Sequence, residues 1–301
     1  NSCKFLIIIV TYFHRNGKFF TRYKHFEKGI NIIMEQLYVF GTGNATVTRY
    51  YNTCFAIKNP ENQYFMVDTG GGNGILRILE DMQVSIPDIH HIFITHEHTD
   101  HLLGIVWMIR VIATRMKNGK YDGDFQIYCH DGLVSTIDTF CKLTLQDKFY
   151  RLIGDRIHLI PVHDGDKRQI LNYPVTFFDI HSTKAMQYGF TMTLENGKQF
   201  TCCGDEPFNP LCESYVKGSD WLTHEAFCLY SQREQFKPYE KHHSTVKDAC
   251  ELAESLGIKN LILWHTEDKN KENREKLYRE EGTPYFTGNL FIPEDETVIT
   301  L

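Results

Sequence analysis

The stretch Thr95-His96-Glu97-His98-Thr99-Asp100-His101 decides how this sequence is interpreted, and it follows an apolar run that ends at Ile94. In an extended backbone alternate side chains share a face, so its first two histidines and its aspartate are predicted to converge on one point. The last histidine would then face a second point. Imidazole and carboxylate groups suit zinc, and also manganese or iron. The stretch therefore predicts half of a two-metal site rather than a His-rich surface turn.

The amino-acid composition indicates a globular protein and limits its possible partners. The chain has 301 residues, of which 42% are hydrophobic and 23% are charged, which suits one large or two small globular domains. Lys and Arg number 32 against 38 for Asp and Glu, a net charge of -6. A net negative charge provides no overall electrostatic attraction for nucleic acid, so any RNA binding would need a local basic patch. The nine cysteines are irregularly spaced and include no C-x-x-C pair, which favours a reducing compartment and a cytoplasmic protein.

Residues 1–33 are expected to form an N-terminal extension to a single globular domain over residues 34–301. The apolar run from Phe5 to Val10 is too short to span a membrane, and no small-residue cleavage site follows it. Cleaner alternation of apolar and polar residues begins at Met34. The extension is interpreted in one of two ways. It is either an addition upstream of an internal translation start at Met34, or a genuine accessory strand of the protein. No membrane association is expected.

Strands and helices alternate through the rest of the chain. Apolar alternation and turn residues predict strands at 36–40, 53–57, 64–67, 125–129, 156–162, 175–180, 190–194, 199–203, 221–227 and 261–264, and helices at 75–82, 102–116, 132–143 and 245–256. This mixture implies two sheets with helices packed outside them. The Gly-rich turn 68–74 lacks the Lys-Ser/Thr of a nucleotide-binding loop. Its first residue, Asp68, is instead expected to support a metal-ligating histidine.

Three further residues of ligand type stand at predicted strand ends: His181, Asp205 and His265. They supply the additional ligands that a site for two metal ions needs beyond the first stretch. The predicted arrangement gives one ion His96, His98 and His181. It gives the other ion Asp100, His101 and His265. Asp205 would bridge the two ions, with room for a shared water.

The pattern T-H-x-H-x-D-H followed by an isolated His, Asp and His resembles the metallo-β-lactamase superfamily. This resemblance implies an α/β (α+β) fold, a four-layer αβ/βα sandwich with two divalent metal ions at the edge between the sheets. Zinc is the first expectation, with manganese or iron as alternatives. Within the superfamily the chain is most similar to ribonuclease Z, the tRNA 3′ endonuclease family. Phe40-Gly41-Thr42-Gly43, Asn52-Thr53 and Tyr188-Gly189-Phe190 resemble segments of that family.

Two segments carry the more specific part of the resemblance. Thr223-His224-Glu225-Ala226-Phe227 resembles the H-E-A-T segment of ribonuclease Z, and His243-Ser244-Thr245 resembles its helix-opening segment. The resemblance implies that Glu225 orients His243 and that His243 protonates the leaving oxygen. Glu225 and His243, together with Asp100, are therefore the predicted catalytic residues. The chemistry agrees, because a nearby carboxylate keeps an imidazole protonated and oriented near neutral pH.

The sequence also departs from ribonuclease Z. That family commonly carries a basic arm that holds tRNA between the His181-type and Asp205-type ligands, whereas here only residues 182–204 separate them. Glu206 stands where the family usually has Thr. The prediction is therefore a binuclear metal-dependent phosphodiesterase that acts on RNA 3′ ends or on small or cyclic phosphodiesters, with tRNA processing in doubt.

Two other functions remain open at this stage. One is a metal-dependent lactonase or glyoxalase II-like thioesterase, which would use the same ligands without Glu225 and His243. The other is a metal-binding sensor or partner protein without turnover. The expected partners are a phosphodiester substrate, either a small molecule or an RNA end, and a second copy of the chain if it forms a homodimer.

Overall fold

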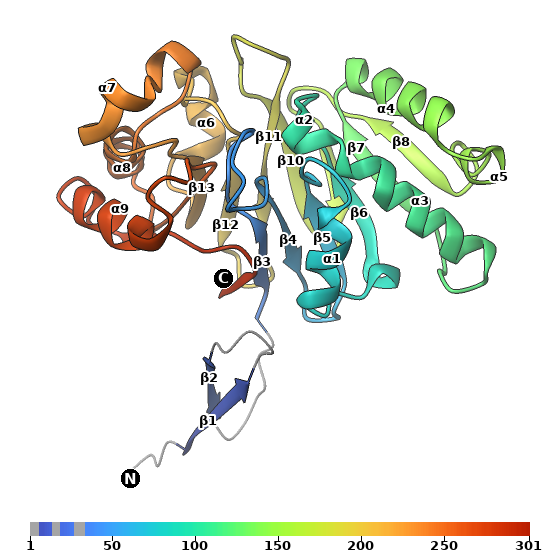
Figure 1. The fold of residues 1–301 in the computed structure, drawn as a ribbon, viewed down its shortest axis with the longest axis horizontal. Helices are drawn as coiled ribbons and strands as arrows, with labels where there is room; N and C mark the ends of the chain where they lie inside the picture. Colours follow the sequence, from blue (N-terminus) through green and yellow to red (C-terminus); the bar gives the residue numbers. More distant parts are fainter. Residues whose placement is uncertain (1–5, 14–18, 27–33) are drawn as a thin grey trace. The chain divides into compact units, whose positions relative to one another are not determined.

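The computed structural model describes residues 6–13, 19–26 and 34–301, and the chain divides into two compact units, Asn1–Met34 and Glu35–Leu301. In the first unit β1 (Leu6–Phe13) pairs antiparallel with β2 (Phe19–Phe26). The remaining residues of the expected extension (1–5, 14–18 and 27–33) lie outside the described residues, drawn as a thin grey trace in Figure 1. The second unit contains the predicted metal ligands.

The first of the two sheets in Glu35–Leu301 has seven strands in the order β16-β3-β4-β5-β6-β7-β8. Its first half is an antiparallel meander and its second half is parallel. The strands are β3 (Gln36–Gly41), β4 (Cys54–Lys58), β5 (Tyr64–Val67), β6 (Ile89–Phe93), β7 (Phe125–Cys129), β8 (Ile157–Pro161) and β16 (Thr297–Thr300). Because β16 comes from the end of the chain, this sheet joins residues far apart in the sequence.

The second sheet also has seven strands, in the order β15-β14-β13-β12-β11-β10-β9. They are β9 (Lys167–Ile170), β10 (Tyr173–Asp179), β11 (Tyr188–Thr193), β12 (Gln199–Cys202), β13 (Trp221–Glu225), β14 (Asn260–Trp264) and β15 (Asn289–Phe291). An aromatic core packs this sheet against the first. Phe55 stacks on Trp264 with ring centroids 4.7 Å apart, and Phe65 meets Phe190 edge-on at 5.4 Å. Such pairs add stability beyond the apolar area that they bury.

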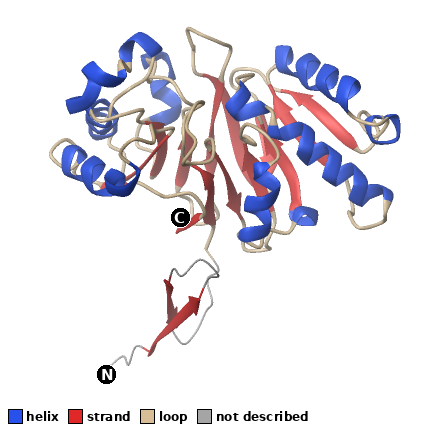
Figure 2. Ribbon diagram, viewed as in Figure 1, coloured by secondary structure: helices blue, strands red, loops and turns tan. Residues whose placement is uncertain are grey.

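Helices cover the outer faces of both sheets, as Figure 2 shows. On the first sheet they are α1 (Gly74–Asp81), α3 (Gly104–Lys117), α4 (Asp131–Thr144) and the single turn α5 (Asp147–Tyr150). On the second they are α6 (Glu213–Val216), α8 (Val246–Ser255) and α9 (Arg274–Gly282), with the short α7 (Arg233–Phe236) nearby. The predicted four-layer sandwich is confirmed. A capping box formed by Thr245 and Asp248 opens α8.

The predicted helix 102–116 is interrupted at its start. A separate turn, α2 (Thr99–Leu102), comes first, and α3 begins at Gly104. In the part of the chain that the structure describes, none of the helices combines the length and the apolarity that crossing a membrane requires.

Gly104 provides a test of this arrangement. A Cβ atom at Gly104 would lie 2.1 Å from the backbone oxygen of Thr69, and the Gly104 amide donates to the Gly70 carbonyl at 2.9 Å. We expect Gly104→Ala to lower the free energy of unfolding by roughly 1–3 kcal/mol, because backbone must move to admit the methyl group. The measurement is urea denaturation, in which the midpoint should fall while the m-value stays unchanged.

Gly72→Ala is the matched control. A Cβ atom at Gly72 would meet nothing within 4 Å, so this substitution should change the free energy of unfolding by less than about 1 kcal/mol. Equal losses for the two variants would mean that α3 does not pack against the backbone of Thr69 as described.

Candidate metal centre

The predicted ligands meet at one edge of the sandwich, where several strands end. The first stretch follows β6 of the first sheet, whereas Asp205 follows β12 and His265 follows β14 of the second. Strands β12, β13 and β14 are parallel, so their carboxyl ends share an edge. Figure 1 shows this edge at the top of the view, close to α2. Residues from both sheets therefore reach the same place.

The first group of ligand-type residues consists of His96, His98 and Asp205. One candidate ligand atom from each lies within 4.8 Å of the others. Nε2 of His96 is 2.9 Å from Nδ1 of His98 and 3.7 Å from Oδ1 of Asp205. These three side chains could hold one metal ion.

The second group consists of Asp100, His101 and His265, again within 4.8 Å of one another. Oδ2 of Asp100 is 3.4 Å from Nε2 of His101 and 3.4 Å from Nε2 of His265. Oδ2 of Asp205 lies 3.5 Å from the first of these imidazole nitrogens and 3.3 Å from the second. The two oxygens of Asp205 thus face different groups, which is the geometry that a bridging carboxylate needs.

The strand alternation that predicted a common face for Asp100, His96 and His98 does not extend far enough. Helix α2 begins at Thr99, so the backbone turns before it reaches Asp100. Asp100 consequently lies with His101 rather than with the two preceding histidines.

His181 is the one predicted ligand that the structure does not bring into either group. Its side chain is 40% exposed, and its Nδ1 lies 3.8 Å from Oδ2 of Asp179. The reason is its position on the exposed connection between β10 and β11, where its backbone is left-handed (φ 56°). The prediction of His181 as a ligand stays a prediction.

Sequence reasoning missed Gln187, which lies beside the first group. Its side chain is buried, and its Nε2 is 2.6 Å from Oδ1 of Asp205 and 2.8 Å from Nδ1 of His96. A glutamine in a loop gives no distinctive sequence signal. Only its position directly before the Tyr188-Gly189-Phe190 segment could have drawn attention to it.

Asp68 supports the second group as the sequence predicted. Its Oδ2 is 2.7 Å from Nδ1 of His101, and both of its oxygens accept hydrogen bonds from the Thr95 hydroxyl. A carboxylate on one ring nitrogen directs the other nitrogen toward a metal. Nε2 of His101 is buried and has no hydrogen-bond partner within the described residues. The donor set therefore fits a metal ion at this position.

Electrostatics keep Asp205 and His96 in the protonation states that metals bind. Burial alone would raise the pKa of Asp205, but the imidazoles of His96, His265 and His101 hold that pKa well below its usual range. Burial lowers the pKa of His96 well below its ordinary value, so this imidazole is neutral. Metal ligands must be deprotonated in this way. For His101, burial lowers the pKa of the imidazole, but the carboxylates of Asp100 and Asp68 outweigh it and raise that pKa well above its ordinary value.

The predicted catalytic pair lies against the second group. Glu225 is fully buried at the end of β13; its Oε1 accepts a hydrogen bond from the Ser244 amide and its Oε2 is 3.5 Å from Nδ1 of His243. The His243 ring lies 5.2 Å from the His265 ring and stacks on Phe227, with centroids 4.9 Å apart and planes within 6°. A buried carboxylate thus faces an imidazole next to the candidate metal ligands.

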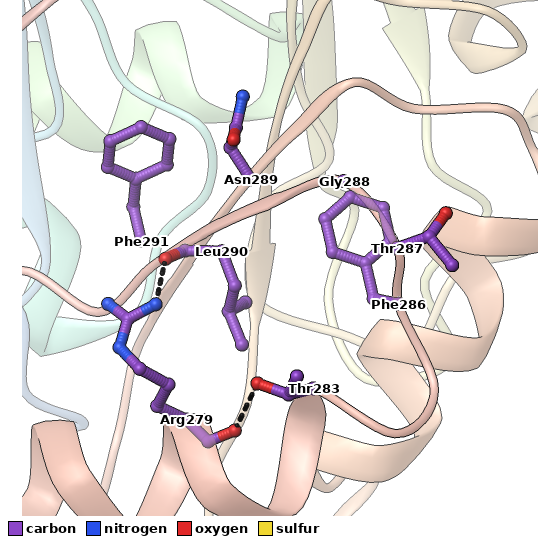
Figure 3. A pocket seen from close by; sticks show the side chains of 8 residues that line it. All are labelled: Arg279, Thr283, Phe286, Thr287, Gly288, Asn289, Leu290 and Phe291. Atoms are coloured by element: carbon purple, nitrogen blue, oxygen red, sulfur yellow. Dashed lines mark hydrogen bonds between the residues drawn. The ribbon is translucent and has the colours of Figure 1, made fainter.

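A separate cavity of about 600 Å³ lies at the outer edge of the second sheet, between the end of α9 and β15. Figure 3 shows its lining, including Arg279 with a guanidinium that donates to the Leu290 carbonyl at 2.9 Å. The Thr283 hydroxyl donates to the backbone carbonyl of Arg279 at 2.7 Å. None of the lining residues belongs to a ligand group, so this cavity is distinct from the candidate metal centre.

Comparison with known families decides where this site belongs. The family described as "Anti-Pycsar protein Apyc1" matches residues 35–285, most of the chain. The chain belongs to the Apyc1 family. Curated relatives of this Apyc1-family chain include Ribonuclease Z of Bacteroides thetaiotaomicron, 22% identical over 76% of this chain and 84% of the relative. Ribonuclease Z of Shouchella clausii is 26% identical over 72% of this chain and 81% of the relative.

Solved structures share the fold of this Apyc1-family chain. The metallo-β-lactamase fold protein YhfI from Bacillus subtilis has a TM-score of 0.71 at 17% identity, covering 88% of this chain and 99% of YhfI. The short form of human tRNase Z has a TM-score of 0.68 at 20% identity, covering 88% of this chain and 98% of that protein. The predicted resemblance to the metallo-β-lactamase superfamily and to ribonuclease Z is confirmed. The protein is a metal-dependent hydrolase.

The bridging geometry generates a prediction about metal content. Asp205→Ala removes the carboxylate that faces both groups, so we expect elemental analysis after reconstitution to show a loss at both positions, from close to two ions per chain to less than one. The control is His158→Ala, because His158 is partly exposed and pairs with Asp124 outside both groups. A wild-type content that stayed at one ion or below would contradict the bridged arrangement.

Proposed function

We propose that this Apyc1-family protein is a two-metal phosphodiesterase that hydrolyses small or cyclic phosphodiesters. The observation that supports it is the buried pair of Glu225 and His243 next to His265. A hydrolase that cleaves a thioester on this fold needs the metal ligands but not a proton donor, because a thiolate is a good leaving group. A phosphodiester with a poor leaving group needs both.

The proposed ligands are the two groups described above, bridged by Asp205, with zinc as the first expectation and manganese or iron as alternatives. When bound, two such ions neutralise charge on the phosphoryl oxygens and lower the pKa of a bound water. We include His181 as a further ligand of the first group. That group has three members in the structure, and a catalytic zinc with three protein ligands and a water can expand to five-coordination, which leaves a position for His181.

His243 is proposed to give its proton to the leaving oxygen. Glu225 faces His243 Nδ1, so the opposite nitrogen, Nε2, is the atom that can donate. Phe227 covers one face of the imidazole and excludes water there, which fixes the plane of the ring. Glu225 is itself held by the Ser244 amide, so the orientation of the donor is set by buried groups.

The short turn between β11 and β12 favours small substrates over RNA. Residues 194–198 form a tight turn between the paired ends Thr193 and Gln199, in the region where ribonuclease Z commonly carries its arm. The net charge of -6 gives no compensating basic field. We therefore place RNA 3′ ends second as a substrate class. The cysteines of residues 34–301 are all unpaired and buried, which supports a cytoplasmic location.

His243→Ala tests the proposed proton transfer. We expect turnover of a phosphodiester with an alkoxide leaving group to fall by about 10²–10⁴-fold, with a much smaller loss for a nitrophenyl diester. Nitrophenolate departs largely unaided, so it does not need the proton. Glu225→Gln should give a similar but smaller pattern. Metal content is measured in parallel and should not change.

Two outcomes would contradict this assignment. Equal losses on both diesters would make His243 a binding or structural residue. Hydrolysis of a thioester or lactone with no hydrolysis of either diester, under added zinc or manganese, would replace the phosphodiesterase by a lactonase or thioesterase.

Substrate size is tested by comparing kcat/KM for a small diester and for precursor tRNA at low and moderate salt. We expect the small diester to be the better substrate and its rate to depend weakly on salt. Each phosphate that a protein neutralises in a nucleic acid makes affinity fall as salt rises. A large advantage of precursor tRNA that collapses with salt would instead reveal a basic docking surface.

A further inference from the structure

The connection between β10 and β11 is held by a residue that the proposed mechanism does not use. Glu206 is 6% exposed and directly follows Asp205. Its Oε1 accepts a hydrogen bond from the Ser182 hydroxyl at 2.8 Å, and its Oε2 accepts one from the Thr183 amide at 3.2 Å. The ammonium of Lys184 lies 3.9 Å from Oε1. A buried carboxylate therefore pins an otherwise exposed connection beside the metal centre.

The same connection touches the segment that carries the proton donor. Oγ1 of Thr183 lies 3.2 Å from Nδ1 of His242, the residue before His243. The segment 182–184 thus lies beside the segment 241–242, which directly precedes His243. We call these residues the rim.

Lys241 gives the rim a positive charge over the ring of Phe227. Its ammonium lies 4.9 Å from the centroid of the Phe227 ring, and that ring stacks on His243. Phe227 occupies the position of Thr in the H-E-A-T segment, so this stack is a departure from the ribonuclease Z pattern. Lys241 is exposed and forms no ion pair with any other residue of 34–301, which leaves its charge available to a ligand.

We propose that the rim binds the leaving-group half of the substrate, with Lys241 contacting an anionic group on it and Glu206 acting as a positioning residue. This inference rests on the proposed function, because His243 must stand beside the leaving oxygen. Whatever is attached to that oxygen then lies next to the rim. The rim would select leaving groups that carry an additional negative charge.

Two aryl methyl phosphodiesters test this directly, one releasing 4-nitrophenolate and the other 3-carboxy-4-nitrophenolate. Both leaving groups depart without a proton, so the role of His243 drops out, and they differ by one carboxylate. We expect the wild type to prefer the carboxylated diester about three- to fivefold in kcat/KM, mainly through KM, as for an exposed charge pair. The preference should decrease as salt is raised.

Lys241→Met and Glu206→Thr should each reduce this preference to about one. Glu206→Thr should also speed amide hydrogen exchange at Thr183, which loses its acceptor. Glu195→Thr is the matched control, because Glu195 is exposed on the turn between β11 and β12, and it should keep the wild-type preference. If Glu206→Thr failed to fold, Lys241→Met would still decide the contact.

The possible failures are distinguishable. Wild-type enzyme that hydrolyses neither diester overturns the proposed function and this inference with it. Hydrolysis of both diesters at equal kcat/KM would contradict only the proposed role of the rim. The same holds if the Lys241→Met variant keeps the full preference for the carboxylated diester. A preference lost in Lys241→Met but retained in Glu206→Thr removes Glu206 from its positioning role.

Discussion

The shared carboxylate of Asp205 is the constraint on which the rest of the site depends. Its two oxygens can face two ligand groups only if the end of β12 in one sheet meets the turn after β6 in the other. The aromatic contacts between the sheets fix that distance. Burying several carboxylates and imidazoles is costly unless each charge is paired, and here every carboxylate of the centre faces at least one imidazole.

Two residues at this edge have a strained backbone conformation, which costs folding free energy. Asp68 and His265 both adopt left-handed backbone (φ 56° and 55°), which residues with a Cβ rarely do. Hydrogen bonds hold each in place: the Asp68 carboxylate binds His101, and Thr266 after His265 exchanges backbone hydrogen bonds with Thr42 and Asn44. Strained residues that persist at an active site are held by such surrounding contacts.

The buried Arg274 reinforces the second of these positions. It donates to the hydroxyls of Thr42 at 2.9 Å and Thr266 at 2.8 Å, and so ties the end of β14 to the turn after β3. One guanidinium can do this because its several N–H groups are fixed in a plane. The candidate ligand His265 is therefore positioned by contacts between the two ends of the second unit.

Sequence alone determined the fold class and the segments whose His and Asp side chains gather at one edge, because periodicity and the spacing of His and Asp are local properties. The resemblance to ribonuclease Z indicated the Glu225–His243 pair, which the structure brings together. The sequence also anticipated the contact of Asp68 with His101. The sequence offered two groupings for Asp100, and the turn of α2 at Thr99 places it with His101 and His265, as the ligand assignment predicted. Tertiary structure decided that His181 lies outside both groups. It alone revealed Gln187, Lys241 and the partners of Glu206, because each contact joins separate connections of the second sheet that only the folded chain brings together.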